Sequence, residues 1–286
     1  MLVTLREVLG DARANGYAVP AFDFTEDFMV RTILETAEDL RAPVILMALE
    51  VDLNSHQGNG WVYQAGLVRA VANHHRLPIV LHLDHANRLE TIQKGLDNGF
   101  SSVMIDGSAL SFDENVRVTR AAVDMAKPLG VSVEAELGLV GGMDLRDEVC
   151  AENVLTNPAE VTQFVERTGV DALAVSIGTS HGVYRSLPNL NIERLKELNA
   201  ASAVPLVLHG GSGTPVDQIQ QAVQNGICKL NLYADLRIAM FSGLKESAAT
   251  MDRIDPLPSE MYGPIRQHLA GVVAEKIRML GAQNRV

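Results

Sequence analysis

The stretch Ile79-Val80-Leu81-His82-Leu83-Asp84-His85 decides the fold expected for this 286-residue chain. A short apolar run ends in polar side chains here, and similar runs recur along the whole sequence. Because these runs are rich in Val, Ile and Leu, they indicate parallel β-strands that are covered on both faces. Eight strands are predicted, at Ala18–Phe22, Val44–Ala48, Ile79–Asp84, Ser102–Asp106, Val131–Glu136, Ala172–Ile177, Pro205–His209 and Ile227–Asn231.

Amphipathic helical patterns alternate with these runs. Proline behind a capping side chain marks helix starts at Asn157-Pro158 and Thr214-Pro215. Eight β/α units predict an α/β protein, a (β/α)8 TIM barrel, as one domain over residues 1–286 with an extra C-terminal helix at Pro264–Leu280. A doubly wound open sheet is the alternative, but no glycine-rich nucleotide motif follows the first strand. The helical patterns are Phe28–Leu40, Glu90–Asn98, Asn115–Ala126, Pro158–Thr168 and Pro215–Gln224.

The composition limits which classes of partner this chain can bind. Its formal net charge of −11 argues against broad binding to nucleic acid or anionic membranes. No apolar run reaches membrane-spanning length, and the first residues lack the basic region of a signal peptide. The two cysteines, Cys150 and Cys228, provide no disulfide framework. We therefore expect a cytoplasmic protein that acts on a small molecule, with no nucleic-acid or membrane partner.

Polar side chains gather at the carboxyl ends of the predicted strands, where TIM barrels place their active sites. Three neutral histidines are a typical ligand set for Zn²⁺ and leave a fourth position open for substrate. His85, His181 and His209 are therefore the predicted zinc ligands. Asp106 and Glu136 either occupy a second metal position or support a ligand histidine. The other polar residues at these ends are His82, Asp84, Glu134 and Asn231.

A second motif indicates phosphate binding. Gly210-Gly211-Ser212-Gly213 precedes the helix start at Thr214-Pro215, and consecutive amides at a helix N-terminus bind phosphate. Lys229, on the last predicted strand, allows a Schiff base that needs no metal. Because three histidines favour the metal, we interpret Lys229 as a structural or supporting charge. The long non-periodic segment Leu139–Asn157 is typical of a functional loop or lid.

These motifs together resemble the class II, zinc-dependent ketose-bisphosphate aldolases, which include fructose- and tagatose-bisphosphate aldolases. The resemblance runs from Gly16 to Arg285, and it is closer to the tagatose type than to the longer fructose type. It implies a lyase that reversibly cleaves a ketose (bis)phosphate into dihydroxyacetone phosphate, or a related ketone, and an aldehyde. The strongest motifs are His82–His85, Ser132–Gly138, Gly178–Gly182 and Leu208–Gly213.

The resemblance also assigns roles to residues. It implies Zn²⁺ on His85, His181 and His209, with Asp106 and Glu136 at an alternative or second metal position. Asp84 is implied as the proton donor or acceptor, and Asp144 stands where the family has a lid glutamate. A monovalent cation, Na⁺ or K⁺, near the phosphate and a homodimer or homotetramer are implied as well. The implied substrate-binding residues are Gly182, Gly210, Gly211, Ser212, Asn231, Leu232, Tyr233 and Ala234.

This chain departs from the family pattern on the substrate side. Asp23 replaces the usual Asn, Leu49 stands near an expected Ser or Thr, and Tyr233-Ala234 ends in Ala234 where the family has a Thr or Ser. These departures predict poor activity on fructose and tagatose bisphosphates and better activity on another ketose, with one phosphate or none. Two other functions stay open: a metal-binding sugar-phosphate sensor without turnover, and a hydrolysis or epimerisation at zinc.

Overall fold

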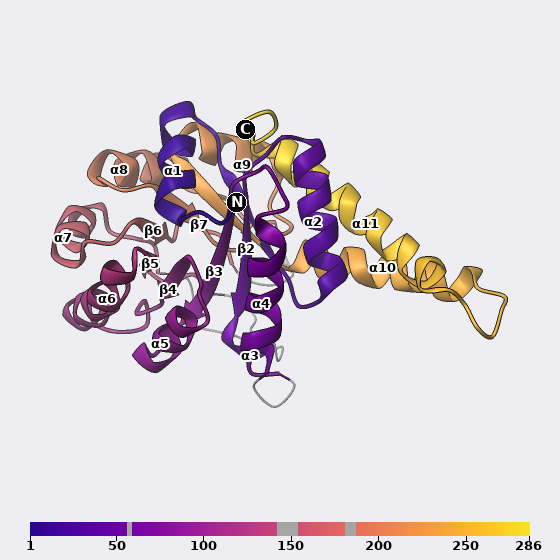
Figure 1. The fold of residues 1–286 in the computed structure, drawn as a ribbon. Coiled ribbons are helices and arrows are strands. Elements are labelled where there is room, and N and C mark those ends of the chain that lie inside the picture. Colours follow the sequence, from indigo (N-terminus) through magenta and orange to yellow (C-terminus); the bar gives the residue numbers. More distant parts are fainter. Residues whose placement is uncertain (56–58, 142–153, 181–186) are drawn as a thin grey trace.

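Eight parallel strands close into one barrel, and their spatial order follows the chain (Figure 1). The structure, a computed structural model, describes residues 1–55, 59–141, 154–180 and 187–286. Strand β8 pairs with β1, which closes the barrel. The predicted TIM barrel is therefore confirmed, and the alternative of an open sheet is wrong. The strands are β1 (Val19–Asp23), β2 (Val44–Leu49), β3 (Ile79–Ala86), β4 (Ser102–Ile105), β5 (Ser132–Leu137), β6 (Ala172–Val175), β7 (Leu206–Leu208) and β8 (Ile227–Leu232).

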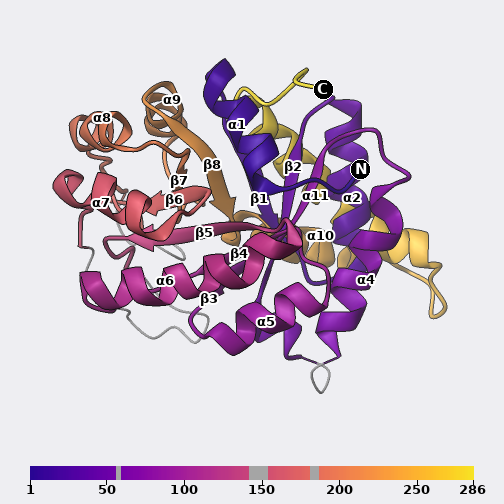
Figure 2. The same ribbon diagram turned by 60° about the vertical axis from the view of Figure 1, so that its left-hand side comes forward.

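Helices surround the barrel and cover the outer faces of its strands (Figure 2). Among the described residues, no helix is both long and apolar enough to cross a membrane. The helices are α1 (Leu5–Asn15), α2 (Asp27–Asp39), α3 (Glu50–Leu53), α4 (Gly60–Ala72), α5 (Leu89–Asp97), α6 (Phe112–Ala126), α7 (Pro158–Thr168), α8 (Ile192–Ala201), α9 (Val216–Gln224), α10 (Ala234–Thr250) and α11 (Pro258–Met279), with a 3₁₀ turn at Lys127–Leu129.

The helix starts follow the sequence signals in one case and depart from them in another. Asn157 caps α7, because its side chain accepts the amide of Ala159 while Pro158 occupies the first turn. Helix α9 begins one residue later than predicted, since Pro215 is its N-cap residue. Thr214 precedes this N-cap residue, and its hydroxyl donates to the carbonyl of Gly210, at 3.2 Å.

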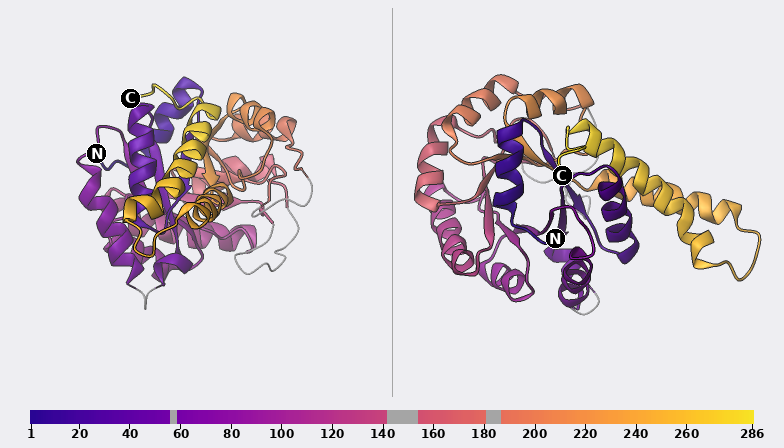
Figure 3. Two further views of the ribbon diagram at one scale, coloured as in Figure 1. Left: turned by 90° about the vertical axis from the view of Figure 1, so that its right-hand side faces the viewer. Right: turned by 45° about the horizontal axis from the view of Figure 1, so that its top comes forward.

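The carboxyl-terminal part of the chain forms a helical arm. The prediction of one helix from Pro264 was wrong at its start, because α11 begins at Pro258 and contains Pro264. Helix α10, which the sequence did not predict, packs along α11, and the pair extends beyond the barrel (Figures 1 and 3). Gly243 permits this close packing, since a Cβ atom there would clash with the backbone of Ile265.

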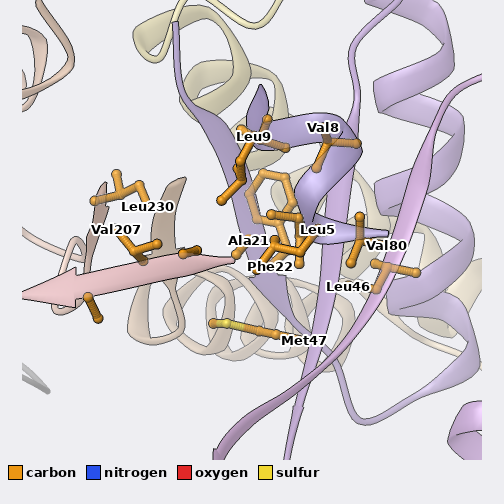
Figure 4. Packing of buried hydrophobic residues seen from close by; sticks show 14 of the residues in the cluster. Leu5, Val8, Leu9, Ala21, Phe22, Leu46, Met47, Val80, Val207 and Leu230 are labelled. Atoms are coloured by element: carbon orange, nitrogen blue, oxygen red, sulfur yellow. The ribbon is translucent and has the colours of Figure 1, made fainter. Parts of the chain in front are cut away.

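Helix α1 closes the amino-terminal end of the barrel. It contacts β1, β5, β6 and β8, which lie on different sides of the barrel axis. Leu5 and Leu9 of this helix are fully buried, in the same hydrophobic cluster as Ala21 and Phe22 of β1 (Figure 4). Because this end is filled by apolar side chains, a substrate reaches the barrel interior from the carboxyl ends of the strands.

Candidate active site

The middle of the barrel holds a buried charged group instead of apolar side chains. Side chains two residues apart on a strand share a face, and His82, Glu134 and Lys229 all point into the barrel. They come from β3, β5 and β8, which are not neighbours, yet Nζ of Lys229 lies 2.9 and 3.0 Å from the carboxylate oxygens of Glu134. The same Nζ lies 3.5 Å from Nε2 of His82, and all three residues are fully buried.

The Lys229–Glu134 pair fixes the orientation of His209. Burial alone would raise the pKa of Glu134, but the Lys229 ammonium together with His209 and His82 outweighs burial and lowers this pKa to about 2. The carboxylate of Glu134 can therefore only accept, and it takes a hydrogen bond from Nε2 of His209, at 2.9 Å. This bond turns Nδ1 of His209 towards the site, where it lies 3.1 Å from Glu136.

His85 occupies a strained position at the end of β3. The pairing register of β3 with β4 shifts between Leu83 and Ala86, and His85 has a φ of 48°, in the left-handed region. A non-glycine residue in this region is uncommon and often marks a functional site. Nδ1 of His85 contacts Asp106 at 2.9 Å, and this contact favours the supporting role for Asp106.

The electrostatics of His85 follow from these neighbours. Burial alone would lower its pKa, but the carboxylates of Asp84 and Asp106 outweigh burial and raise the pKa to about 10. In turn His85 holds the pKa of Asp84 well below its usual range, against the effect of burial. The mouth of the barrel thus concentrates negative charge around one imidazole, which is the environment that a divalent cation requires.

The donor atoms at the mouth fit a zinc ion. The imidazole rings of His85 and His209 meet edge to face, 4.7 Å apart between centroids. One donor atom from each of Asp84, His85 and His209 lies within 4.8 Å of the others, and the same holds for His85, Asp106 and Glu136. Imidazoles with carboxylate support are the ligands that zinc takes in catalytic sites. The third predicted ligand, His181, lies outside the described residues.

Asp84 is held in place by an amide. Asp84 is 4% exposed, and Nδ2 of Asn231 donates to both of its carboxylate oxygens, each at 3.1 Å. The strand register places Leu49 of β2 beside Asp84, so one flank of this carboxylate is apolar. An ionised, oriented carboxylate next to the histidine cluster is suited to proton transfer on a bound substrate.

Comparison with known proteins agrees with this geometry. The chain matches the family described as fructose-bisphosphate aldolase class-II over residues 3–285. The chain belongs to this family. It is 38% identical to the fructose-bisphosphate aldolase of Staphylococcus epidermidis and to the probable fructose-bisphosphate aldolase of Bacillus subtilis, over 99% of both sequences in each case. The solved YdjI aldolase of Escherichia coli K12 is 33% identical, with a TM-score of 0.88 over 100% of this chain and 99% of that one.

The chain is therefore a class-II aldolase, a lyase of carbon–carbon bonds. The resemblance noted in the sequence is confirmed over nearly its whole length. In this aldolase, Lys229 is paired with Glu134 deep in the barrel, as expected for a structural or supporting charge. Membership of this enzyme family favours a catalytically active aldolase and disfavours a sugar-phosphate sensor without catalysis.

The loop after β7 is hydrogen-bonded to the end of β8 at the mouth of the barrel. The amide of Gly211 donates to the carbonyl of Asn231, at 3.2 Å. The hydroxyl of Ser212 accepts the amide of Tyr233 at 3.2 Å, and so helps to begin α10. Helix α9 starts at Val216, three residues after this loop, and the predicted phosphate cradle stays a prediction. Gly210 has a φ of 68°, where glycine is favoured.

The remaining predicted site residues divide into three groups. Asp144, His181 and Gly182 lie outside the described residues. Leu232 is fully buried in the hydrophobic core, so only its main chain is available to a ligand. Tyr233 and Ala234 form the junction of β8 and α10.

Sequence reasoning missed three residues near the site. Ser102 opens β4 and contacts Nδ1 of His82, at 2.8 Å, and period-two spacing from Asp106 could have indicated it. Asp52 and Arg237 lie near Asp23 at the mouth. Asp52 raises the pKa of Asp23, and Arg237 lowers it. Neither belongs to a motif, because α3 is short and α10 has no one-sided apolar pattern.

Removing the buried ammonium should destabilise the barrel strongly. Lys229→Met leaves the Glu134 carboxylate buried without its cation, and we expect the free energy of unfolding to fall by about 3–5 kcal/mol. Denaturant unfolding followed by circular dichroism measures this change. The double variant Lys229→Met/Glu134→Gln carries no buried charge and should recover part of the loss. Equal instability of the single and double variants would show that packing of the lysine stem, not charge, is responsible.

Proposed function

We propose that this class-II aldolase reversibly cleaves a ketose phosphate into dihydroxyacetone phosphate and an aldehyde, with zinc on His85, His181 and His209. The observation that carries the proposal is the convergence of two oriented histidines and one ionised, amide-held carboxylate at the open end of the barrel. Relatives named fructose-bisphosphate aldolase support the substrate class. Asp106 and Glu136 are proposed to support the ligands or to hold a second metal position.

The proposed roles separate proton transfer from metal binding. A bound Zn²⁺ supplies Lewis acidity to the carbonyl side of the substrate. In cleavage, Asp84 takes the proton from the hydroxyl of the carbon that becomes the aldehyde, the carbon–carbon bond breaks, and the electron pair stays with the ketone fragment. We assign to Asp144 the return of a proton to that fragment. Asn231 keeps Asp84 oriented throughout.

The phosphate of the ketone fragment is proposed to bind between the loop after β7 and the start of α10. Gly210, Gly211 and Ser212 offer main-chain groups on one side, and the main chain of the segment 231–234 lies on the other. Gly182, which lies outside the described residues, is proposed as a further phosphate-binding residue. A monovalent cation, Na⁺ or K⁺, is proposed near this phosphate. We also propose a reducing cytoplasm as the location, where a free thiol such as that of Cys228 stays reduced.

One assay tests the proposed activity. Zinc-loaded enzyme is mixed with dihydroxyacetone phosphate and a panel of aldehydes, and the new carbon–carbon bond is followed by proton NMR. The proposal expects coupling with at least one aldehyde and no coupling with unphosphorylated dihydroxyacetone at equal concentration. Tight binding of dihydroxyacetone phosphate without any product would instead support the sensor function.

We also propose that the arm formed by α10 and α11 joins two copies into a homodimer, alone or within a homotetramer. Three large apolar side chains on α10 follow each other at intervals of three residues and are each more than half exposed. An apolar stripe of this kind on a projecting arm is typical of an interface. The stripe consists of Ile238, Phe241 and Leu244.

A charge in this stripe should disrupt the assembly. Phe241→Glu places a carboxylate in the proposed interface, and we expect a smaller species than the wild type by size-exclusion chromatography with light scattering. Leu129→Glu is the matched control, since Leu129 is 62% exposed and Phe241 is 58% exposed, but Leu129 lies in the turn before β5. A monomeric wild type, or an unchanged mass for Phe241→Glu, would contradict the arm interface.

A further inference from the structure

A group of buried polar atoms at the mouth lacks partners among the described residues. Asp23 ends β1 and is 1% exposed, yet its Oδ1 accepts no hydrogen bond. Ala21 pairs with Asn231, so the same register, continued by two residues, places Asp23 beside Tyr233. The hydroxyl of Tyr233 is also buried without a partner. Buried polar groups are nearly always hydrogen-bonded, so two such atoms on neighbouring residues point to a missing ligand.

The charges around these two atoms define what that ligand can be. Asp52 of α3 and Arg237 of α10 complete the group, and the guanidinium of Arg237 lies 4.4 Å from the centre of the Tyr233 ring. Burial raises the pKa of Asp23 well above its usual range, and the carboxylates of Asp52 and Asp84 add to this effect. The two carboxylates of Asp23 and Asp52, against the single guanidinium of Arg237, disfavour a phosphate group beside the Tyr233 side chain.

The group lies on the aldehyde side of the site. Asp84 is close enough to Asp23 to raise its pKa. The contacts of His85 and His209 with Asp106 and Glu136 involve β4 and β5, across the barrel from β1. If Asp84 moves the proton of the aldehyde oxygen, the carbons next to that oxygen extend from Asp84 towards Asp23 and Tyr233.

We propose that Asp23 and Tyr233 form a subsite for the hydroxyl groups of the aldehyde, and that this aldolase takes a polyhydroxylated aldehyde without a phosphate. The inference rests on the proposed aldolase function and names its substrate class. A hydroxyl group both donates and accepts, which matches the unpartnered Oδ1 of Asp23 and the hydroxyl of Tyr233. An apolar aldehyde would leave both atoms unpaired, and a phosphorylated one would meet two carboxylates and one guanidinium.

Three aldehydes test the subsite in condensation with dihydroxyacetone phosphate: glyceraldehyde, propanal and glyceraldehyde 3-phosphate. We expect wild-type kcat/KM to be highest for glyceraldehyde, by about tenfold over propanal, the effect of one to two net hydrogen bonds. Tyr233→Phe should lower the ratio of glyceraldehyde to propanal by about threefold, because the hydrogen bond at Asp23 remains. Tyr17→Phe is the matched control, because its hydroxyl is bonded to Asp11 near the closed end of the barrel and the ratio should not change.

A second pair of variants separates hydrogen bonding from packing. Asp23→Leu removes the hydrogen-bonding group and should also lower the preference for glyceraldehyde by about threefold, whereas Asp23→Asn keeps a donor and an acceptor and should retain the preference. A wild type that prefers glyceraldehyde 3-phosphate, or a ratio that Tyr233→Phe leaves unchanged, would overturn the subsite. If the wild type couples none of the three aldehydes, propanal included, the aldolase function itself fails. Coupling of propanal without a preference for hydroxyl groups refutes only the subsite.

Discussion

Replacing Asp84 by alanine should lower kcat by about 10²–10⁴-fold, the range for loss of a general acid–base group. The carboxylate is ionised, buried and held by both of its contacts with Asn231, so its removal deletes the proposed proton carrier without opening the barrel. Steady-state kinetics of condensation and of cleavage should show the same loss. Zinc content, measured by atomic absorption, should remain that of the wild type.

The metal measurement makes this variant decisive. One oxygen of Asp84 lies within 4.8 Å of donor atoms of His85 and His209, so the geometry also permits it to be a ligand. If Asp84→Ala loses zinc in proportion to activity, Asp84 binds or supports the metal and is not the proton carrier. Asp106→Ala is the companion variant, because it removes the support of His85 and should lower zinc affinity by about 10–100-fold.

Removing the metal is expected to have the largest effect of all. Dialysis against a chelator should abolish condensation, and added Zn²⁺ or Co²⁺ should restore it, because imidazole and carboxylate donors accept both ions. Circular dichroism of the metal-free protein should remain that of a folded barrel. The Lys229–Glu134 pair holds His209 without any ion, so the site persists in the absence of metal. Full activity after complete zinc removal would refute the zinc site.

Much of the architecture follows from local sequence patterns. The strands were predicted within about two residues at each end, because parallel strands in a barrel are apolar on the side that the helices cover. The site histidines were predicted because the carboxyl ends of all strands meet at one mouth. His85 and His209 do converge there, 4.7 Å apart between ring centroids.

The contacts inside the barrel could not be predicted in the same way. Glu134 and Lys229 stand 95 positions apart, and their pairing depends on closure of the barrel and on which strands face each other across its axis. Side chains alternate between the two faces of β5 and β8, so the sequence indicates that Glu134 and Lys229 both point inward. It does not indicate which residue each of them contacts. The left-handed φ of His85 likewise results from a register shift between β3 and β4.

The arm was mispredicted for a different reason. The predicted periodicity relied on apolar residues facing the barrel, whereas α10 also carries exposed apolar residues such as Ile238 and Phe241. Its pattern is therefore not one-sided, and the helix was missed. Asp23 stood out in the sequence only as a departure from a family, and the closure of β8 on β1 is what places it beside Tyr233.

The central claim is that this chain performs aldol chemistry at zinc and not through a lysine Schiff base. The most direct test incubates zinc-loaded enzyme with dihydroxyacetone phosphate in deuterated water and follows hydrogen exchange on its hydroxymethyl carbon by NMR, followed by borohydride treatment and mass spectrometry. We predict exchange that stops with a chelator, resumes with Zn²⁺, and leaves the mass of the chain unchanged after borohydride. Exchange that persists without metal, together with a reduced adduct on Lys229, would contradict the account.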